Sequence, residues 1–354
     1  MSAVLLWSSD ESVLLKVDTL SGVVIVPNTC KRIARMAFQG NRTIKKVVLS
    51  EGLEEIEVAA FKNCSALEEI HIPESVRIIG KYAFAGCSSL LKVALPTHLK
   101  CIDNGMFQGC INLKNIKTPP FLTRVGEYSF SDCLALKDVA LPNTVVEIGK
   151  RAFFKCSALS SVEIKGFVRA VGKEVFYGCR ELQAVNALGI ETVAERMFAN
   201  CRSLRTIEIS QGTIRVEKEA FSGCRSLKCV SLPSTVEYID ENAFSLCGFL
   251  FIELPASLFR IGDGAFCGSS LMRKVLIPAR TIEIGRKAFY NCRFLRQIIL
   301  PPSIKRIAKD VCSEMTQSEG VVFYAPSDKV NWLQEQLPYN KVKSLEMISD
   351  GDFL

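Results

Sequence analysis

The chain has 354 residues, 15 cysteines, only 2 histidines and a formal net charge of +7. With 48% hydrophobic and 23% charged residues it can bury a large core, which excludes an intrinsically disordered chain, and its length alone suggests two domains. Two histidines leave little room for histidine-based metal sites or catalytic triads, and the cysteines are too sparse for a small disulfide-stapled scaffold.

The amino-terminal segment lacks the features of a secretory signal. The first basic residue is Lys16 and the only early apolar run is Ala3 to Trp7, whereas a signal needs a basic start and roughly 7–15 apolar residues. No segment reaches the roughly 18 uninterrupted apolar residues of a membrane span, since Glu253 and Pro255 break the longest candidate, Leu246 to Phe259. We therefore expect a cytoplasmic chain with reduced thiols, with export to the cell surface without a signal peptide as the alternative.

Phenylalanine recurs along the chain at an interval of 23 residues, shortened twice to 22. The series comprises Phe38, Phe61, Phe84, Phe107, Phe130, Phe153, Phe176, Phe198, Phe221, Phe244, Phe266 and Phe289. With phenylalanine as position 1, a clean repeat (residues 61–83) carries Cys at position 4, apolar residues at 7, 10, 12, 16 and 19, and Pro at 13. Such a fixed period predicts a solenoid, in which each repeat buries its apolar edge only when the next one stacks on it.

Each repeat is expected to contain a short strand. Positions 10 to 12 alternate between inward and outward and are mostly β-branched, and proline at position 13 ends the strand because it cannot donate to a ladder. Positions 16 and 19 form a second apolar segment. The stretch Gly-x-x-Ala-Phe-x-x-Cys, as in residues 80–87, predicts a helical turn that packs Ala, Phe and Cys inward. We attribute the recurrent glycine at position 20 to the turn itself.

The pattern C-x-x-L-x-x-I-x-(I/L)-P-x-x-V-x-x-I-G-x-x-A-F resembles the BspA-like class of leucine-rich repeats. Residues 133–153 and 224–244 match it almost position by position. The resemblance implies a leucine-rich-repeat solenoid of about 12–13 coils of 22–23 residues, with short strands stacked in a curved parallel sheet and short helical or extended segments on the other side. It departs from the commoner leucine-rich consensus, because a Pro follows the strand and the Cys precedes it.

The ends of the repeat series are expected to be capped, because an open solenoid end exposes core and strand edge. Residues 1–21 form the expected N-terminal cap, residues 22–312 the solenoid and residues 313–354 the C-terminal cap. In the last segment, Ser327 can cap a short helix at about 328–336, which Pro338 ends. The apolar face of that helix comprises Val330, Leu333 and Leu337.

Ten of the fifteen cysteines occupy position 4 of the repeat. They are Cys64, Cys87, Cys110, Cys133, Cys156, Cys179, Cys201, Cys224, Cys247 and Cys292. A disulfide or metal ladder is one interpretation, but parallel Cβ vectors disfavour bonding between neighbouring coils. Asn41 and Ser269 fill the same slot, so we interpret the column as small buried packing residues. No Cys-x-x-Cys pair is present, and we expect no metal and no cofactor.

The remaining cysteines lie off this column. Cys229 at position 9 and Cys267 at position 2 are expected to be exposed, and Cys30, Cys101 and Cys312 to be part-buried. Redox sensing at Cys229 or Cys267 is an alternative role.

Recognisable catalytic motifs are missing from the sequence. His71 and His98 have neither a second histidine nor a convincing acid partner at ligand spacing, and there is no phosphate-binding loop, dinucleotide fingerprint or Gly-x-Ser-x-Gly elbow. Carboxylate pairs such as Glu54-Glu55 lie on outer positions, where a solvated face explains them. We therefore expect no enzyme and name no catalytic residue.

Positions 5 and 8 flank the inward leucine just before the strand and are strongly basic. Across twelve repeats these 24 places hold twelve cations and one acid, Glu68, where composition predicts about three cations. They carry a net +11, against +7 for the whole chain, and we call them the basic ridge. Its cations are Arg42, Lys45, Lys114, Lys137, Arg180, Arg202, Arg205, Arg225, Lys228, Arg273, Arg293 and Arg296.

Two interpretations of the basic ridge stay open. Cationic stems can shield coil edges and keep the array soluble, or the ridge can dock an acidic protein or another polyanion. The ridge lacks interleaved aromatic residues, which disfavours nucleic acid as a partner. Leu276 and Ile299 in adjacent coils, with Phe294 near them, predict an exposed apolar spot. Phe121 and Phe167 at turn positions form another candidate spot, or pack locally.

The sequence favours a non-catalytic protein–protein interaction scaffold that binds an acidic partner through the sheet face and the basic ridge. The candidate contact residues are Arg180, Arg202, Arg205, Arg225, Lys228, Arg273, Arg293, Arg296, Leu276 and Ile299. One alternative is a cell-surface adhesin, which the family resemblance suggests. Another is a structural subunit of a larger assembly. No oligomeric state is predicted.

Overall fold

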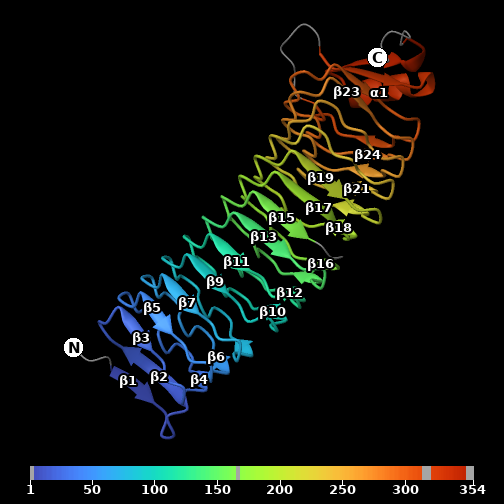
Figure 1. Ribbon diagram of the computed structural model, residues 1–354. Helices are drawn as coiled ribbons and strands as arrows, with labels where there is room; N and C mark the ends of the chain where they lie inside the picture. The colour runs from blue at the N-terminus through green and yellow to red at the C-terminus, as the bar shows by residue number, and fades with distance from the viewer. Residues whose placement is uncertain (1–3, 165–167, 313–319, 348–354) are drawn as a thin grey trace. The chain divides into compact units, whose positions relative to one another are not determined.

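The structure, a computed structural model, describes residues 4–164, 168–312 and 320–347. The chain divides into two compact units, Met1–Asn186 and Ala187–Leu354, which we call the N-terminal and C-terminal units. The division falls in the first shortened repeat, between Phe176 and Phe198. Each unit is a parallel β-solenoid with little helix, which confirms the predicted fold class (Figure 1).

In the N-terminal unit each coil contributes strands to two sides of the solenoid. The strands at positions 9 to 12 are β3 (Val23–Ile25), β5 (Lys46–Val48), β7 (Glu69–His71), β9 (Lys92–Ala94), β11 (Asn115–Lys117), β13 (Asp138–Leu141), β15 (Ser161–Ile164) and β17 (Ala184–Leu188). The two-residue strands at positions 18 and 19 are β4 (Arg32–Ile33), β6 (Glu55–Ile56), β8 (Ile78–Ile79), β10 (Cys101–Ile102), β12 (Arg124–Val125), β14 (Glu147–Ile148) and β16 (Ala170–Val171). Their ladders are parallel and keep the repeat register.

The C-terminal unit repeats this arrangement except in the described coils that begin at Phe221 and Phe244, which have no strand at positions 9 to 12. On that side, Ser231 forms an isolated parallel bridge with Glu208. The strands of this unit at positions 9 to 12, with the two strands added beyond the repeats, are β19 (Thr206–Ile209), β23 (Lys274–Leu276), β25 (Gln297–Ile299), β27 (Val322–Ala325) and β28 (Lys341–Ser344). Its two-residue strands are β18 (Thr192–Val193), β20 (Arg215–Val216), β21 (Tyr238–Ile239), β22 (Arg260–Ile261), β24 (Glu283–Ile284) and β26 (Arg306–Ile307). The pairings among these described strands are parallel.

An antiparallel hairpin begins the N-terminal unit. It consists of β1 (Val4–Trp7) and β2 (Val13–Asp18), and β2 then pairs in parallel with β4. The hairpin therefore lies against the first strand of the short-strand ladder, where the sequence places the N-terminal cap.

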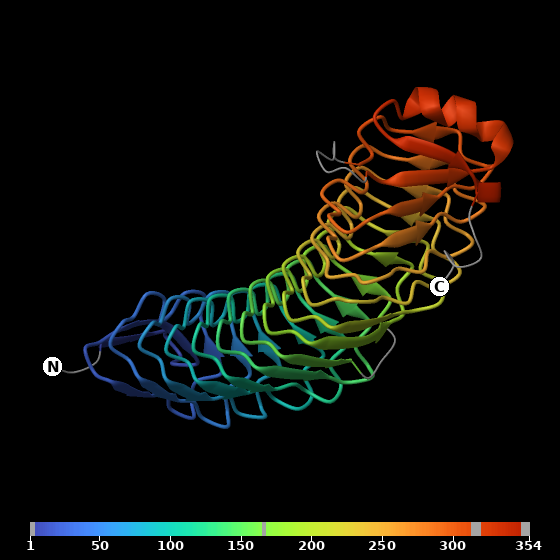
Figure 2. The ribbon, with the colours of Figure 1, turned by 90° about the horizontal axis from the view of Figure 1, so that it is seen from above.

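A short helix, α1 (Val330–Gln336), lies where the sequence places one, after a 3₁₀ turn η1 (Ser327–Lys329) and beside the end of the sheet (Figure 2). The predicted cap by Ser327 is wrong, because its hydroxyl hydrogen-bonds the Ser344 hydroxyl at 2.8 Å and no side chain caps the helix. Leu333 and Leu337 are buried. The chain then adds β28 beside β27, which we did not predict, and ends its described part in η2 (Leu345–Met347).

The phenylalanine column forms the core of each unit, as predicted. Every member is at most 1% exposed. Rings of successive coils stack face to face, for example Phe84 and Phe107 at 5.6 Å and 6°, and Phe221 and Phe244 at 5.1 Å and 1°. The stacking repeats the same contact from coil to coil, as expected for a solenoid.

The segment from position 20 to position 4 is a run of turns, so the predicted helical turn is wrong. Positions 22 and 3 have positive φ, 58° at Tyr82 and 74° at Gly86, on either side of Phe84. Hydrogen bonds from a backbone N–H to the carbonyl three residues earlier close these turns. The N–H groups between them donate to the next coil instead, as the Phe84 N–H does to the Met106 carbonyl at 2.9 Å. Because φ changes sign along this segment, every second N–H points toward the next coil. Neighbouring coils are therefore hydrogen-bonded here as well as in the sheets.

Glycine at position 20 has a different cause from the one we predicted. Gly149 does not have positive φ. A Cβ built on it would lie 2.6 Å from the nitrogen of Glu127 and 2.8 Å from the carbonyl carbon of Gly126, both in the preceding coil. The glycine is therefore needed because the backbone of the neighbouring coil passes too close for a side chain.

Candidate partner-binding surface

The basic ridge of the C-terminal unit is a column of adjacent exposed side chains. The Leu250 N–H donates to the Lys228 carbonyl at 3.2 Å, and the Arg296 N–H to the Arg273 carbonyl at 2.8 Å. At these two steps the position-8 residues of neighbouring coils therefore lie side by side, and the bridge between Glu208 and Ser231 keeps Arg205 and Lys228 in the same register. The exposed ridge cations of this unit are Arg202, Arg205, Arg225, Lys228, Arg273, Arg293 and Arg296.

These seven cations have no counter-charge within the part of the C-terminal unit that the structure describes. None of them forms an ion pair there. The guanidinium of Arg296 donates only to main-chain carbonyls, those of Arg293 at 3.1 Å and Leu295 at 3.3 Å. The ridge thus presents positive charges that form no ion pair with any described residue of this unit.

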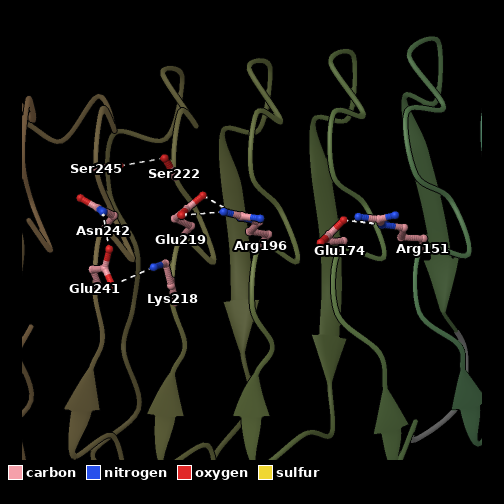
Figure 3. Close-up of polar contacts among 9 residues, drawn as sticks. All are labelled: Arg151, Glu174, Arg196, Lys218, Glu219, Ser222, Glu241, Asn242 and Ser245. Carbon is pink, nitrogen blue, oxygen red and sulfur yellow. Dashed lines mark hydrogen bonds and ion pairs between the residues drawn. The ribbon is translucent and has the colours of Figure 1, made fainter.

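Another face of the same unit, built from position 18 and the turns after it, pairs its charges. Figure 3 shows Arg196 reaching Glu219 of the next coil with two hydrogen bonds of 2.8 and 2.9 Å, and Lys218 reaching Glu241 at 2.8 Å. The same arrangement occurs in the pairs Arg215–Asp240, Arg260–Glu283 and Arg286–Asp310. Cations therefore meet acids from coil to coil on that face, in contrast to the ridge.

Arg180, also a predicted contact residue, is exposed and lies in the N-terminal unit. The ridge of that unit contains the single acid, Glu68, whose carboxylate lies 3.5 Å from the ammonium of Lys45. The larger uncompensated charge is therefore in the C-terminal unit, and we restrict the candidate surface to it.

Two neighbouring apolar residues, Leu250 and Phe251, interrupt the ridge in its middle coil, and we call them the apolar step. Leu250 is 50% exposed and Phe251 is 58% exposed, and Leu250 takes position 8 because this coil lacks one residue after Cys247. We did not predict this pair from the sequence. The signal was present, since no other repeat has apolar residues at both position 8 and position 9.

Of the two residues that we predicted to form an exposed apolar spot, Leu276 is exposed and Ile299 is not. Leu276 is 62% exposed and Phe294 is exposed too, but Ile299 is only 6% exposed. Ile299 pairs with Tyr324 of β27, which is itself buried, so the strand added beyond the repeats covers that position. Phe121 is exposed, and Phe167 lies outside the described residues.

The cysteine column donates hydrogen bonds to the phenylalanine column. Cys110 Sγ donates to the Phe84 carbonyl at 3.2 Å. The thiols of Cys64, Cys224 and Cys292 donate in the same way to the phenylalanine carbonyl of the preceding coil. Ser269 uses its hydroxyl for the same contact with Phe244, at 3.1 Å. The slot therefore requires a small buried donor, in agreement with the packing interpretation.

The cysteines off the column differ partly from expectation. Cys229 is exposed as predicted, and Cys267 is half-buried. Cys30 and Cys312 are buried rather than part-buried, and Cys312 pairs by a parallel bridge with Phe289, which puts it in the phenylalanine column. Cys101 is half-buried. None of the fifteen cysteines, all of which lie in the described ranges, forms a disulfide.

Raising the pH above about 9 is expected to destabilise both units through their buried thiols. Burial raises the pKa of Cys110 to about 12 and that of Cys292 to about 12, whereas an exposed thiol in the unfolded chain ionises near its ordinary value. The thiol pKa is higher in the folded than in the unfolded chain, so raising the pH ionises the unfolded chain first. The contribution to the free energy of unfolding is therefore complete below pH about 9 and is lost progressively towards pH about 12. The loss reaches up to about 1.4 kcal/mol per pH unit for each thiol. Urea unfolding across this range measures the loss.

The variant Cys110→Ser is the control, because Ser269 shows that a hydroxyl keeps the hydrogen bond of this slot. It should lessen the alkaline loss of stability in the N-terminal unit. An unchanged dependence on pH would show that the thiol column does not cause it.

The N-terminal unit also contains an open groove of about 840 Å³. Its lining includes Lys31, Glu54, Arg77 and His98. The two signs of charge alternate in it, with Lys31 lying 3.8 Å from Glu54. Such a lining matches neither an anionic nor a cationic ligand, and the basic ridge stays the stronger candidate.

Two further findings concern the described residues as a whole. None of their helices combines the length and apolar character needed to cross a bilayer. No group of three or more His, Cys, Asp or Glu side chains among them is placed to hold a metal ion.

Comparison with solved structures finds the same fold in bacterial proteins. A leucine-rich repeat protein from Bacteroides ovatus is 22% identical with a TM-score of 0.53, over 97% of this chain and 98% of that one. A leucine rich cell surface protein from Faecalibacterium prausnitzii is 21% identical with a TM-score of 0.58, over 99% and 95%. The pneumococcal vaccine antigen PcpA is 20% identical with a TM-score of 0.54, over 96% and 82%.

Comparison of the sequence with protein families agrees with these structures. The BspA type leucine rich repeat region matches in six copies, which span residues 19–137, 123–250 and 191–319. No curated protein sequence matches the chain. Because the family match covers most of the chain and the fold agrees with it, the chain belongs to the BspA-type leucine-rich repeat family.

Proposed function

We propose that the chain is a non-catalytic binding protein whose C-terminal unit holds an acidic protein partner on the basic ridge. One observation carries the proposal: in the described part of that unit, seven exposed ridge cations form no ion pair, and their column contains no acid. Six of the seven are arginines, whose planar guanidinium binds a carboxylate through two hydrogen bonds.

Solubility alone accounts less well for this arrangement. A surface that mixes both signs of charge keeps a protein soluble, and the face that contains Arg196–Glu219 and Lys218–Glu241 is of that kind. A row of like charges instead costs electrostatic repulsion, which a partner of opposite charge relieves on binding. The row also speeds the encounter with such a partner, in a way that salt weakens.

Reversing four ridge charges together is expected to abolish partner capture. The variant carries Arg202→Glu, Arg205→Glu, Arg225→Glu and Lys228→Glu, all at exposed positions. Because truncating one partner of a hydrogen-bonded charge pair buried in an interface costs about 2–5 kcal/mol, reversal of four should weaken binding by more than about 1000-fold, to below detection. Affinity capture from the native cell with the full chain, followed by mass spectrometry, measures the loss of each captured protein.

The control reverses four exposed cations of the same unit that lie off the ridge. They are Arg280, Lys287, Lys305 and Lys309. Both variants change the net charge equally and should keep the circular dichroism of the parent. Capture that is equal for the ridge variant and the parent would remove the ridge from the function.

We also propose that the protein acts inside the cell, supported by the free and exposed thiol of Cys229, which fits a reducing compartment. Adhesion at the cell surface is the second candidate, favoured by the likeness to a leucine rich cell surface protein of Faecalibacterium prausnitzii. Biotin labelling of intact cells separates the two. Protection of the protein supports the intracellular role, and labelling supports adhesion.

A further inference from the structure

We infer that the segment bound by the basic ridge of the C-terminal unit is an acidic amphipathic α-helix that lies along the stack of coils, with an apolar side chain on its middle turn. The inference rests on the proposed function and specifies its partner. It follows from two properties of the ridge, its spacing and its order of side chains.

The spacing of the coils matches the pitch of an α-helix. Neighbouring strands lie about 4.8 Å apart, and the stacked rings of Phe221, Phe244, Phe266 and Phe289 in this unit are 5.1 to 5.6 Å apart. An α-helix rises about 5.4 Å per turn, so each turn meets one coil and the mismatch over four steps stays near 2 Å. Long arginine side chains accommodate such a difference.

An extended segment does not match this spacing. Side chains on one face of a strand recur about every 6.7 Å, almost 2 Å more than the distance between coils. After four coils the two repeats differ by more than one full coil. Successive acids of an extended segment would therefore miss successive ridge cations, so the spacing selects a helix.

The order of side chains at position 8 defines the complementary face. Five successive coils present Arg205, Lys228, Leu250, Arg273 and Arg296. The matching helix has acids on its first, second, fourth and fifth turns and an apolar residue on the third, over about 18 residues. Position 5 adds Arg202, Arg225 and Arg293 beside three of these coils, which extends the positive charge at both ends of the ridge and leaves its middle apolar.

The apolar middle coil favours a protein segment over a sulfated polysaccharide. A polysaccharide would use the cations but has no apolar group to place on Leu250 and Phe251, which are both at least half exposed. A helix with one central leucine buries this surface, and arginines on either side hold its acids. Such an apolar centre within a polar rim is typical of protein interfaces.

The test uses a designed peptide as the probe. It is a fluorescein-labelled helix of about 18 residues with glutamate on turns one, two, four and five of one face, leucine on turn three, and alanine and glutamine elsewhere. A second peptide of equal composition distributes the glutamates around the helix, and circular dichroism verifies that both are helical. Fluorescence anisotropy with the full chain should show at least tenfold weaker binding of the second peptide.

Substitution of the apolar step supplies an independent readout. Leu250→Ala should weaken binding of the designed helix by about tenfold, because it removes the apolar contact at the middle turn. Leu246→Ala makes the same change at another exposed leucine, at position 3 and off the ridge, and should leave binding unchanged. Equal effects of the two substitutions would contradict the inference.

The outcomes separate this inference from the proposed function. If the ridge charge reversal abolishes capture of the native partner but both peptides bind equally, the helix inference is wrong and the binding function stands. If heparin fragments bind more tightly than the designed helix and Leu250→Ala does not affect them, the ridge is a polyanion site and the inference is overturned. Selective binding of the designed helix, lost in Leu250→Ala, supports it.

Discussion

Replacing Phe107 by alanine is expected to lower the free energy of unfolding of the N-terminal unit by about 3–5 kcal/mol. Its ring is fully buried and stacks on the rings of Phe84 and Phe130, each at 5.6 Å. Alanine leaves a cavity between two coils that the hydrogen bonds on either side hold apart, so the cavity cannot close. Urea unfolding followed by circular dichroism measures the loss, and hydrogen exchange should place it in the coils next to the cavity.

The matched control is Phe121→Ala, the same chemical change in the same unit at a residue that is 61% exposed. It should change stability by no more than about 0.5 kcal/mol. Similar losses in the two variants would mean that the phenylalanine column is not the main source of stability.

Replacing Gly149 by alanine is expected to destabilise the N-terminal unit by about 1–3 kcal/mol, although it adds only a methyl group. The new Cβ would lie 2.6 Å from the nitrogen of Glu127, which is main chain of the preceding coil and cannot rotate away. The two coils must separate to admit it, which weakens the hydrogen bond from the Gly149 N–H to the Val125 carbonyl, now 2.8 Å. The midpoint of urea unfolding measures the effect.

Gly22→Ala provides the comparison for this substitution. A Cβ there would meet only the Thr43 carbonyl at 3.9 Å, an ordinary contact, and Gly22 does not have positive φ. The variant should be neutral or slightly stabilising, because alanine restricts the unfolded chain. If Gly149→Ala behaved in the same way, close approach of the coils would not explain the glycine at position 20.

The interior of the solenoid could be predicted because every coil offers the same slots to the same neighbours. The burial of Phe221 and Cys224 follows from register alone. Backbone handedness does not, since Tyr82 and Arg151 adopt positive φ that neither residue type favours. The ladder between coils imposes that conformation, and a single repeat read by itself contains no sign of it.

The candidate surface was predictable in its charge and less so in its apolar part. Columns of cations appear once the repeats are aligned, but the absence of ion pairs along the described ridge of the C-terminal unit depends on where the acids of the next coil lie. Ile299 occupies an outward position in register and is buried by β27, a strand beyond the regular repeats. Leu250 enters position 8 only because its coil is one residue short.

Protection of Cys229 by a bound partner tests the central claim most directly. Its exposed thiol, at position 9, directly follows the ridge residue Lys228 in the chain, whereas the half-buried Cys267 lies at position 2, away from the ridge. The measurement is the rate of maleimide modification of each thiol, by mass spectrometry, with and without the captured partner. Our account predicts that the partner slows modification of Cys229 at least tenfold and leaves the rate at Cys267 unchanged. Unchanged modification of Cys229 in the saturated complex would contradict it.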